Sequence, residues 1–385
     1  MGGEYFMFAS VRKAVPVLSL TLALGLEAEN TENSYSLKDC GIQENENCMA
    51  RGCTNALGGA LEFDILYWRA QNPGFSCIGY EQKNPYIYRP SSRAAQIAGI
   101  EPNAISSNQY LFDVGSEIRL ESRWDPGFRI GTGWNTDFDR WDVFVDWTWY
   151  KSHPSESKER KDLIFPTLLG FLPVSWAPTT TTTFSSFSAS WRILHNAADL
   201  ELGRAYYMTK AFSLRIHCGL RGSWINQKAK NSFLNPILPT TILTQTKNNF
   251  WGIGPRIGIN GQWHIAESDW SVLGKASTSL LMGKTRARFQ VTGIQPSLTL
   301  PLEDFKDNLD LFAPNFQIFL GVDWGSGLDH EKYYVGFNAG WEANIYWNQY
   351  NVPATKTPYE FAGIPSHSTE ALTMGGLTAS IYFDF

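Results

Sequence analysis

The chain has 385 residues, with 32 Lys and Arg against 37 Asp and Glu, so its formal net charge is −5. A nucleic-acid binder would carry a basic excess, so no nucleic-acid partner is expected. Beyond residue 28, no apolar run is long enough for a spanning helix. The chain is rich in aromatics and glycine, with 15 Trp, 16 Tyr, 24 Phe and 33 Gly. This profile fits a transmembrane β-barrel or a secreted β-domain.

The first 28 residues have the order of a secretory signal peptide. Arg12 and Lys13 precede an apolar stretch from Ala14 to Leu26, and Ala28 offers a small residue for cleavage. The stretch is too short to span a bilayer; the alternative is a buried N-terminal helix. We expect a signal peptide at 1–28, a cysteine-containing periplasmic segment at 29–58 and a barrel at 59–385.

Five cysteines suggest disulfides, because a secreted chain matures in an oxidising compartment. The odd number leaves at least one thiol free or paired between chains. The spacing fits no zinc site, and we expect neither a metal nor a cofactor. The pattern does not fix which cysteines pair. The disulfide candidates are Cys40, Cys48, Cys53 and Cys77.

Apolar and polar residues alternate with period two along most of the chain. Leu61, Phe63, Ile65 and Tyr67, for example, share one face of a predicted strand. The pattern predicts ten strands, at 59–71, 109–136, 141–151, 185–207, 211–227, 248–264, 270–287, 309–325, 330–348 and 369–385. The phase slips near His195–Ala198, which predicts a bulge.

The connections between these strands alternate between short and long. The short ones are 137–140, 208–210, 266–269 and 325–329; the long ones are 72–108, 152–184, 229–247, 288–308 and 349–369. Short turns should lie in the periplasm and long loops outside the cell. A missed hairpin in 72–108 or 152–184 would give twelve strands, so the expected count is even. Segment 152–184 could constrict the lumen or contact a partner.

A transmembrane antiparallel barrel explains this pattern better than a soluble sandwich, which also alternates. The strands suffice to cross a bilayer, and their opposite face carries charges that would line a water-filled lumen. Large aromatics near strand ends would form the interfacial girdles. They are Trp68, Trp124, Trp134, Trp141, Trp149, Trp224, Trp251, Trp263, Trp324, Trp341 and Trp347.

The charged face supplies the candidate pore-lining residues. They are Glu62, Asp64, Arg119, Arg123, Arg129, Asp142, Asp146, Arg215, Arg221 and Arg256, with Arg192, Asp199, Glu201 and Lys275 as further candidates. Acids and bases on opposed arcs would set a field across the lumen. In the alternative reading, these charges pair between neighbouring strands inside a plugged interior.

The sequence does not predict an enzyme. His195 is expected to face outward, whereas the neighbouring Ser188 and Ser190 are expected to face inward, so no Ser–His pair forms. The acidic stretch 137–142 lacks the glycine and the final glutamate of a calcium loop.

The last strand ends in Ile381, Phe383 and Phe385 on one face. A closing strand with a C-terminal Phe resembles the assembly signal of bacterial outer-membrane barrels. This resemblance implies the barrel assembly machinery as a partner.

Several strings resemble the major outer-membrane-protein-like porins of Legionella and the chlamydia-related bacteria. They are residues 63–71 (FDILYWRAQ), 124–133 (WDPGFRIGTG), 139–142 (DRWD), 147–150 (WTWY), 199–204 (DLELGR) and 214–221 (LRIHCGLR). The resemblance implies a pore-forming protein of the bacterial outer membrane. It also implies disulfide cross-linking in the envelope, here through Cys40, Cys48 and Cys53.

Together these features predict a general diffusion porin that passes small hydrophilic solutes and ions through the outer membrane. The main alternative is a structural or adhesive surface protein, cross-linked by disulfides, whose barrel is only an anchor. A third reading is a soluble secreted β-domain. Expected partners are outer-membrane lipid and small solutes, with a homo-oligomer or disulfide-linked envelope proteins as further candidates.

Overall fold

The computed structural model describes residues 58–73, 77–81, 87–88, 110–111, 116–136, 141–166, 184–209, 211–235, 240–265, 268–328, 333–350 and 370–385. Ten strands form the barrel. They are β1 (Gly59–Gln71), β6 (Trp124–Asn135), β7 (Trp141–Ser152), β9 (Phe184–Thr209), β10 (Phe212–Asn235), β11 (Thr240–His264), β12 (Trp270–Gln295), β13 (Leu298–Leu328), β14 (Tyr333–Tyr350) and β15 (Glu370–Asp384).

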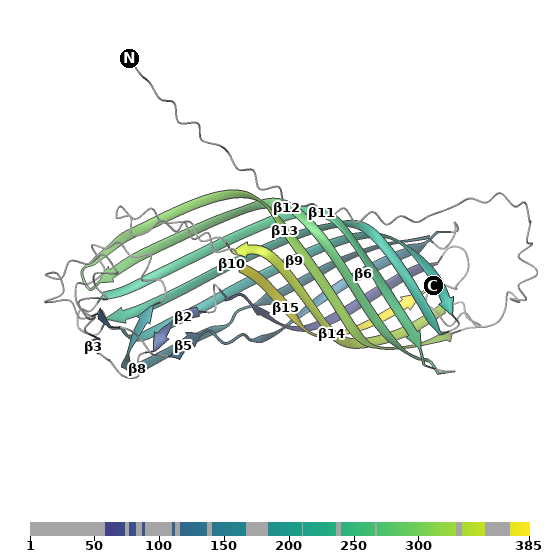
Figure 1. Ribbon diagram of the computed structural model, residues 1–385, viewed down its shortest axis with the longest axis horizontal. Coiled ribbons are helices and arrows are strands. Elements are labelled where there is room, and N and C mark those ends of the chain that lie inside the picture. The colour runs from purple at the N-terminus through teal and green to yellow at the C-terminus, as the bar shows by residue number, and fades with distance from the viewer. Residues whose placement is uncertain are drawn as a thin grey trace, which may run out of the picture. The chain divides into compact units, whose positions relative to one another are not determined.

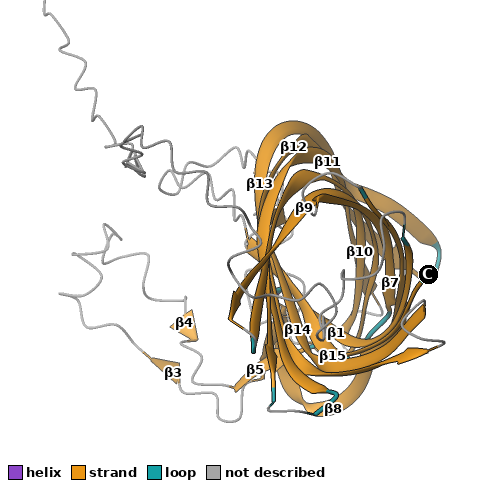
Figure 2. Cartoon of the chain, turned by 90° about the vertical axis from the view of Figure 1, so that its right-hand side faces the viewer, coloured by secondary structure: helices purple, strands orange, loops and turns teal. Residues whose placement is uncertain are grey.

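These strands make a closed antiparallel ring (Figure 1). Around it, β1 pairs with β6, β6 with β7 and β7 with β9, and pairing then runs in chain order from β9 to β15. Pairing of β15 with β1 closes the ring, which Figure 2 shows nearly end on. The expected all-β antiparallel barrel with an even strand number is therefore confirmed, and closure leaves no edge for lipid to solvate.

Five further described strands lie outside the ring: β2 (Cys77–Glu81), β3 (Ile87–Tyr88), β4 (Tyr110–Leu111), β5 (Ser116–Arg119) and β8 (Ser155–Pro166). β8 pairs with the outer part of β9 and carries β2 and β5, while β3 pairs with β4. The single strand expected at 109–136 is therefore wrong, because β5 belongs to this side sheet and only β6 joins the barrel. Alternation continues through both pieces and does not reveal the break.

The predicted loops 229–247 and 288–308 are also wrong. The β10–β11 pair continues to Asn235 and Thr240, and the β12–β13 pair continues to Gln295 and Leu298. These two hairpins extend past the end of the barrel that lies opposite the short turns. Because the longer connections of such barrels are extracellular, this end is the extracellular one. Their outward side chains meet water rather than lipid, so the sequence there loses its lipid-facing apolar residues and resembles a loop.

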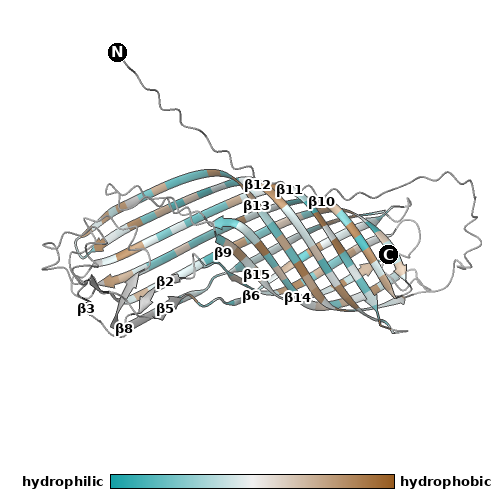
Figure 3. Cartoon of the chain, viewed as in Figure 1, coloured by the Kyte–Doolittle hydropathy of each residue, from teal (hydrophilic) through white to brown (hydrophobic). Residues whose placement is uncertain are grey.

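The outer wall of β11 shows where the bilayer lies. Trp251 and Trp263 are twelve residues apart on this wall, and exposed Ile253, Ile257 and Ile259 lie between them (Figure 3). Twelve residues of about 3.3 Å each, tilted by about 40°, cover about 30 Å, the thickness of a bilayer core. On β10, Trp224 is the register partner of Trp251 and marks the same outer boundary.

Beyond this boundary β9, β10 and β11 keep their phase. On β9, His195, Ala197, Asp199 and Glu201 all point inward, as do Trp191 and Ile193 above them. The register with β7 and β10 shows no shift at these residues, so the bulge expected near His195–Ala198 is wrong. What changes is the chemistry of the inward face, from charged to apolar.

Trp68 is the exception among the aromatics expected in the girdles. It points inward and is fully buried. The signal peptide and Cys40, Cys48 and Cys53 lie outside the described residues. Cys77 begins β2, and Cys218 is exposed on the outer wall of β10 with a free thiol.

Candidate functional site

The half of the barrel that faces the short turns encloses a polar cavity of about 380 Å³. It extends to Thr136 and Asp384, at the periplasmic end of the ring. Eight side chains with a carboxyl group line it, against three arginines and one lysine, so acidic groups outnumber basic ones in the lining. The carboxylates are Glu62, Asp64, Asp142, Asp146, Asp199, Glu201, Glu342 and Asp384; the cations are Arg129, Arg215, Arg256 and Lys275.

Arg129 ties three strands together at the centre of this cavity. Its Nη1 lies 2.9 Å from Oδ2 of Asp64 on β1, and its Nη2 lies 2.7 Å from Oε1 of Glu342 on β14. Its Nε donates to Oγ1 of Thr148 on β7 at 2.9 Å. All these groups are largely buried, so the guanidinium and the carboxylates compensate one another.

Arg221 and Arg256 make a second set of bridges. Nε of Arg221 donates to Asp199 Oδ1 at 2.6 Å, and its Nη2 donates to Gln317 Oε1 at 2.7 Å. Nη1 of Arg256 reaches the same Gln317 oxygen at 3.1 Å, while its Nε donates to Glu201 Oε1 at 3.1 Å. Gln317 is on β13, whereas Arg221 is on β10 and Arg256 on β11. These contacts therefore link β9, through the two arginines, to β13.

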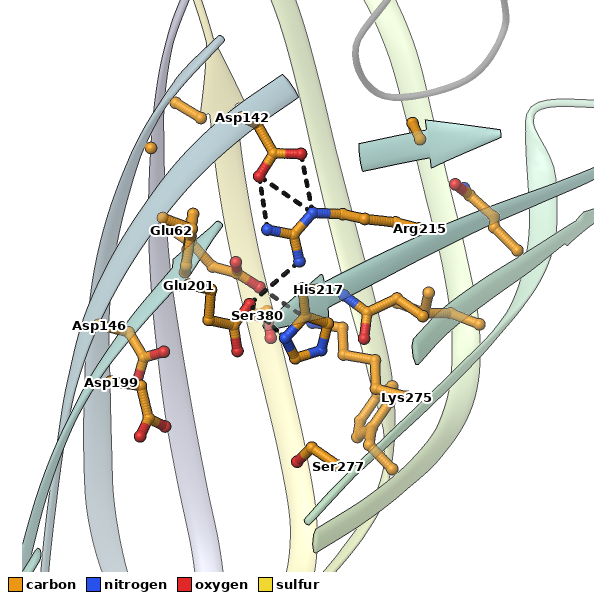
Figure 4. A pocket seen from close by; sticks show the side chains of 18 of the residues that line it. Glu62, Asp142, Asp146, Asp199, Glu201, Arg215, His217, Lys275, Ser277 and Ser380 are labelled. Atoms are coloured by element: carbon orange, nitrogen blue, oxygen red, sulfur yellow. Dashed lines mark hydrogen bonds and ion pairs between the residues drawn. The ribbon is translucent and has the colours of Figure 1, made fainter. Parts of the chain in front are cut away.

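Nearer the periplasmic end, Arg215 lies between two acids (Figure 4). Its Nε donates to Asp142 at 2.9 and 3.0 Å, and its Nη1 lies 3.0 Å from Glu201 Oε2. His217 Nδ1 lies 3.3 Å from the same Glu201 oxygen. The two opposed arcs expected from the sequence do not form, because acids and bases are interleaved around the ring and pair.

The structure places seven of the ten pore-lining candidates in this cavity: Glu62, Asp64, Arg129, Asp142, Asp146, Arg215 and Arg256. Arg221 is buried in the same interior. Two candidates are wrong. Arg119 lies on β5, outside the ring, and the side chain of Arg123 is 70% exposed and pairs with Asp125 at 3.2 Å. Both errors follow from joining β5 to β6 as one strand.

Of the further candidates, Asp199, Glu201 and Lys275 line the cavity, whereas Arg192 faces outward. Lys275 Nζ lies 3.4 Å from Glu62 Oε1, which crosses the lumen from β12 to β1. Sequence reasoning did not single out Glu342, although the alternation places it on the polar face. Glu342 matters because it pairs with Arg129, which lies three strands away around the ring. No local sequence pattern indicates this contact.

Above the cavity, aromatic side chains from opposite walls meet. Tyr346 on β14 and His195 on β9 stand five strands apart in the ten-strand ring, yet His195 Nε2 and Tyr346 Oη are 3.1 Å apart. Tyr150 Oη donates to the carbonyl of Trp68 at 3.0 Å, and Trp68 Nε1 donates to Thr378 Oγ1 at 3.0 Å. We call Trp68, Tyr150, His195 and Tyr346 the aromatic layer.

One continuous apolar cluster extends from this layer into the extracellular half of the barrel. It includes Leu66 on β1, Ile225 on β10, Phe250 on β11 and Leu281 on β12, all nearly or fully buried. Since it joins opposite walls, the described side chains close the lumen at this height. The predicted His195 orientation is wrong for the same reason: beyond the bilayer, apolar and aromatic groups turn inward.

The expected assembly signal lies at the seam of the ring. The backbone N–H of Phe385 donates to Gly59 at 2.9 Å, and that of Gly59 donates to Phe385 at 2.7 Å. Ile381 faces outward, and the rings of Phe383 and Phe385 stack with centroids 5.8 Å apart. The β8 segment of 152–184 lies against β9 and not across the ring.

The sequence matches one known family of proteins. Residues 61–385 match the family model described as Legionella pneumophila major outer membrane protein precursor. Similar solved structures include the outer membrane protease OmpT from Escherichia coli, at 8% identity and a TM-score of 0.38, covering 87% of this chain and 99% of that one. A Pseudomonas aeruginosa FadL homologue aligns at 7% identity and a TM-score of 0.24, covering 86% and 90%. No curated relative matches in sequence.

Proposed function

Because the chain belongs to the family of the Legionella pneumophila major outer membrane protein, a family of the bacterial outer membrane, we propose that it is a pore-forming protein for small hydrophilic solutes and ions. The observation that carries this proposal is the polar cavity inside the ring. Its excess of carboxylates would concentrate cations at the periplasmic end of the path. The proposal involves no covalent chemistry.

The proposed pore is narrow and gated, two properties that the general diffusion porin expected from the sequence does not specify. The aromatic layer and the apolar cluster above it fill the interior, so ions and solutes pass only when these side chains move. Rotation of Tyr346 would break its contact with His195 and open the closest crossing between opposite walls. We therefore expect small, intermittent conductance steps.

The test is single-channel recording of the refolded full chain in a planar bilayer under a salt gradient. Steps with a reversal potential on the cation side support the pore. Tyr346→Ala should raise the open probability by about tenfold, because it removes the ring that meets His195; Tyr346→Phe, which keeps the ring, should raise it far less. If both variants behave like the parent chain, the aromatic layer is not the gate.

A second function is favoured by the closed interior itself. A barrel filled by a continuous apolar cluster can serve as an anchor for a structural or adhesive surface protein. If the protein inserts, shows heat-modifiable migration and remains silent even with Tyr346→Ala, the pore is excluded and the anchor replaces it.

A further inference from the structure

A row of basic side chains crosses the outer wall of the barrel on its extracellular side. Arg192 on β9 is the register partner of Lys228 on β10, Lys228 is the partner of Lys247 on β11, and Lys247 is the partner of Arg288 on β12. All four lie on the outward-facing parity of their strands. We call Arg192, Lys228 and Lys247 the basic row.

The basic row lies just above the apolar band. Lys228 comes four residues after Trp224, and Lys247 comes four residues before Trp251, so both are equally far beyond the outer girdle. Four residues extend about 13 Å along a strand, or about 10 Å along the membrane normal once the tilt is included. The headgroup region extends about 5–8 Å beyond the hydrocarbon core, so the long Lys and Arg side chains reach it when they extend toward the membrane.

Among the described residues, no acid pairs with the basic row. None of its three side chains, nor neighbouring Lys230, forms an ion pair with another described residue. Desolvation and the charges of Lys230, Lys247 and Arg192 lower the pKa of Lys228. Like charges directly opposite each other destabilise a sheet, so a bound anion would stabilise the row.

On the next strands, bases of the outer wall pair with acids, both at the level of the basic row and at the level of Trp251. Arg288 Nη2 lies 2.6 Å from Asp304 Oδ2, and Lys284 Nζ lies 3.7 Å from Asp310 Oδ1. Acids therefore accompany the bases on β12 and β13 but not on β9 to β11. The difference marks one arc of the wall as a surface for an anion.

We propose that the basic row binds the phosphate groups of the phosphorylated glycolipid in the outer leaflet. Arg and Lys side chains at headgroup height give charge-assisted hydrogen bonds to phosphate oxygens. Below them, Trp224, Trp251 and Ile253 present an apolar surface to the acyl chains of the same lipid. A soluble polyanion would match the charges but would leave that apolar surface uncovered.

The experiment titrates the refolded full chain in neutral detergent with bisphosphorylated lipid A and counts bound lipid by native mass spectrometry. The test variant carries Arg192→Gln, Lys228→Gln and Lys247→Gln. The matched control removes the same charge from the balanced arc, as Lys284→Gln, Arg288→Gln and Lys306→Gln. Loss of the basic row should weaken lipid A binding by at least about tenfold, and the control by less than about threefold.

Three results would overturn the proposal. Equal weakening in the test and control variants would mean that only net charge matters. Equal binding of dephosphorylated lipid A would exclude the phosphates, and equally tight phosphatidylglycerol would exclude the glycolipid. Heat-modifiable migration checks that each variant is folded. If a triple variant does not fold, the single change Lys228→Gln replaces it, and Lys228→Arg, which keeps the charge, should restore binding.

Discussion

The barrel has two regions with opposite chemistry, separated by the level of Trp224 and Trp251. Toward the periplasm, charged side chains such as Asp199 and Arg256 point inward and isoleucines point outward. Toward the outside, Phe233 and Phe289 point inward while Lys228 points outward. β9, β10 and β11 cross from one region to the other without changing phase, whereas the register of β14 with β15 shifts between Tyr346 and Tyr350. The solvent around the wall, lipid or water, decides which chemistry each face carries.

This difference explains how each region is stabilised. Burial of apolar surface away from water drives the packing of the extracellular half. Lipid offers no such gain to the wall within the bilayer, so the periplasmic half is held by backbone pairing and by ion pairs across the lumen, as between Arg129 and Glu342.

The largest expected difference between the two regions is their response to an acid placed at an inward position. Ala287 and Ser277 both point inward on β12, in the apolar and the polar region respectively. Ala287→Asp should lower the free energy of unfolding by about 3–5 kcal/mol, because it buries an unpaired charge. Ser277→Asp, beside the polar cavity, should cost about 1 kcal/mol. Urea unfolding in phosphatidylcholine vesicles measures both, and equal costs would contradict the division.

A second change sharpens the role of the periplasmic region. Arg215→Gln removes a cation from a cavity that already has excess carboxylates, so the cation-to-anion permeability ratio should rise by about twofold. The control is Arg123→Gln, which removes the same charge from an exposed side chain outside the cavity. Reversal potentials under a salt gradient distinguish the two. A shift with Arg123→Gln alone would place the ion path elsewhere.

The smallest effect concerns the water-facing wall of β12 and β13. A hydrogen bond from Arg288 lowers the pKa of Asp304 below its ordinary value. The pair therefore stabilises the folded chain above the unfolded pKa of about 3.9, and this contribution is lost as the pH falls through the lowered value. Carboxyl titration by NMR should show a low pKa that returns to the ordinary range in Arg288→Gln. An unchanged titration curve would mean that the pair does not persist in solution.

The ten strands and their inward parity could be predicted because both follow from local alternation and short turns. The extracellular ends could not, since their outward lysines and asparagines resemble loop residues. The sequence predicts the wrong face for His195 because this residue shares the parity of Trp191 and Ile193, which a continuing lipid phase would place outward. Contacts such as Lys275 with Glu62 depend on how the ring closes, and no local pattern contains that information.

The seam between β1 and β15 has a consequence for biogenesis. Trp68 and Thr378, which hydrogen-bond beside it, are 310 residues apart in the chain. Closing a loop of that length costs about 5 kcal/mol of chain entropy, far more than any of the tight hairpins, so the seam is expected to form late. Until Phe385 has been delivered, β1 has no final partner and the growing sheet has two open edges. The ring can therefore close only after the last strand has been delivered, however the other strands pair before it.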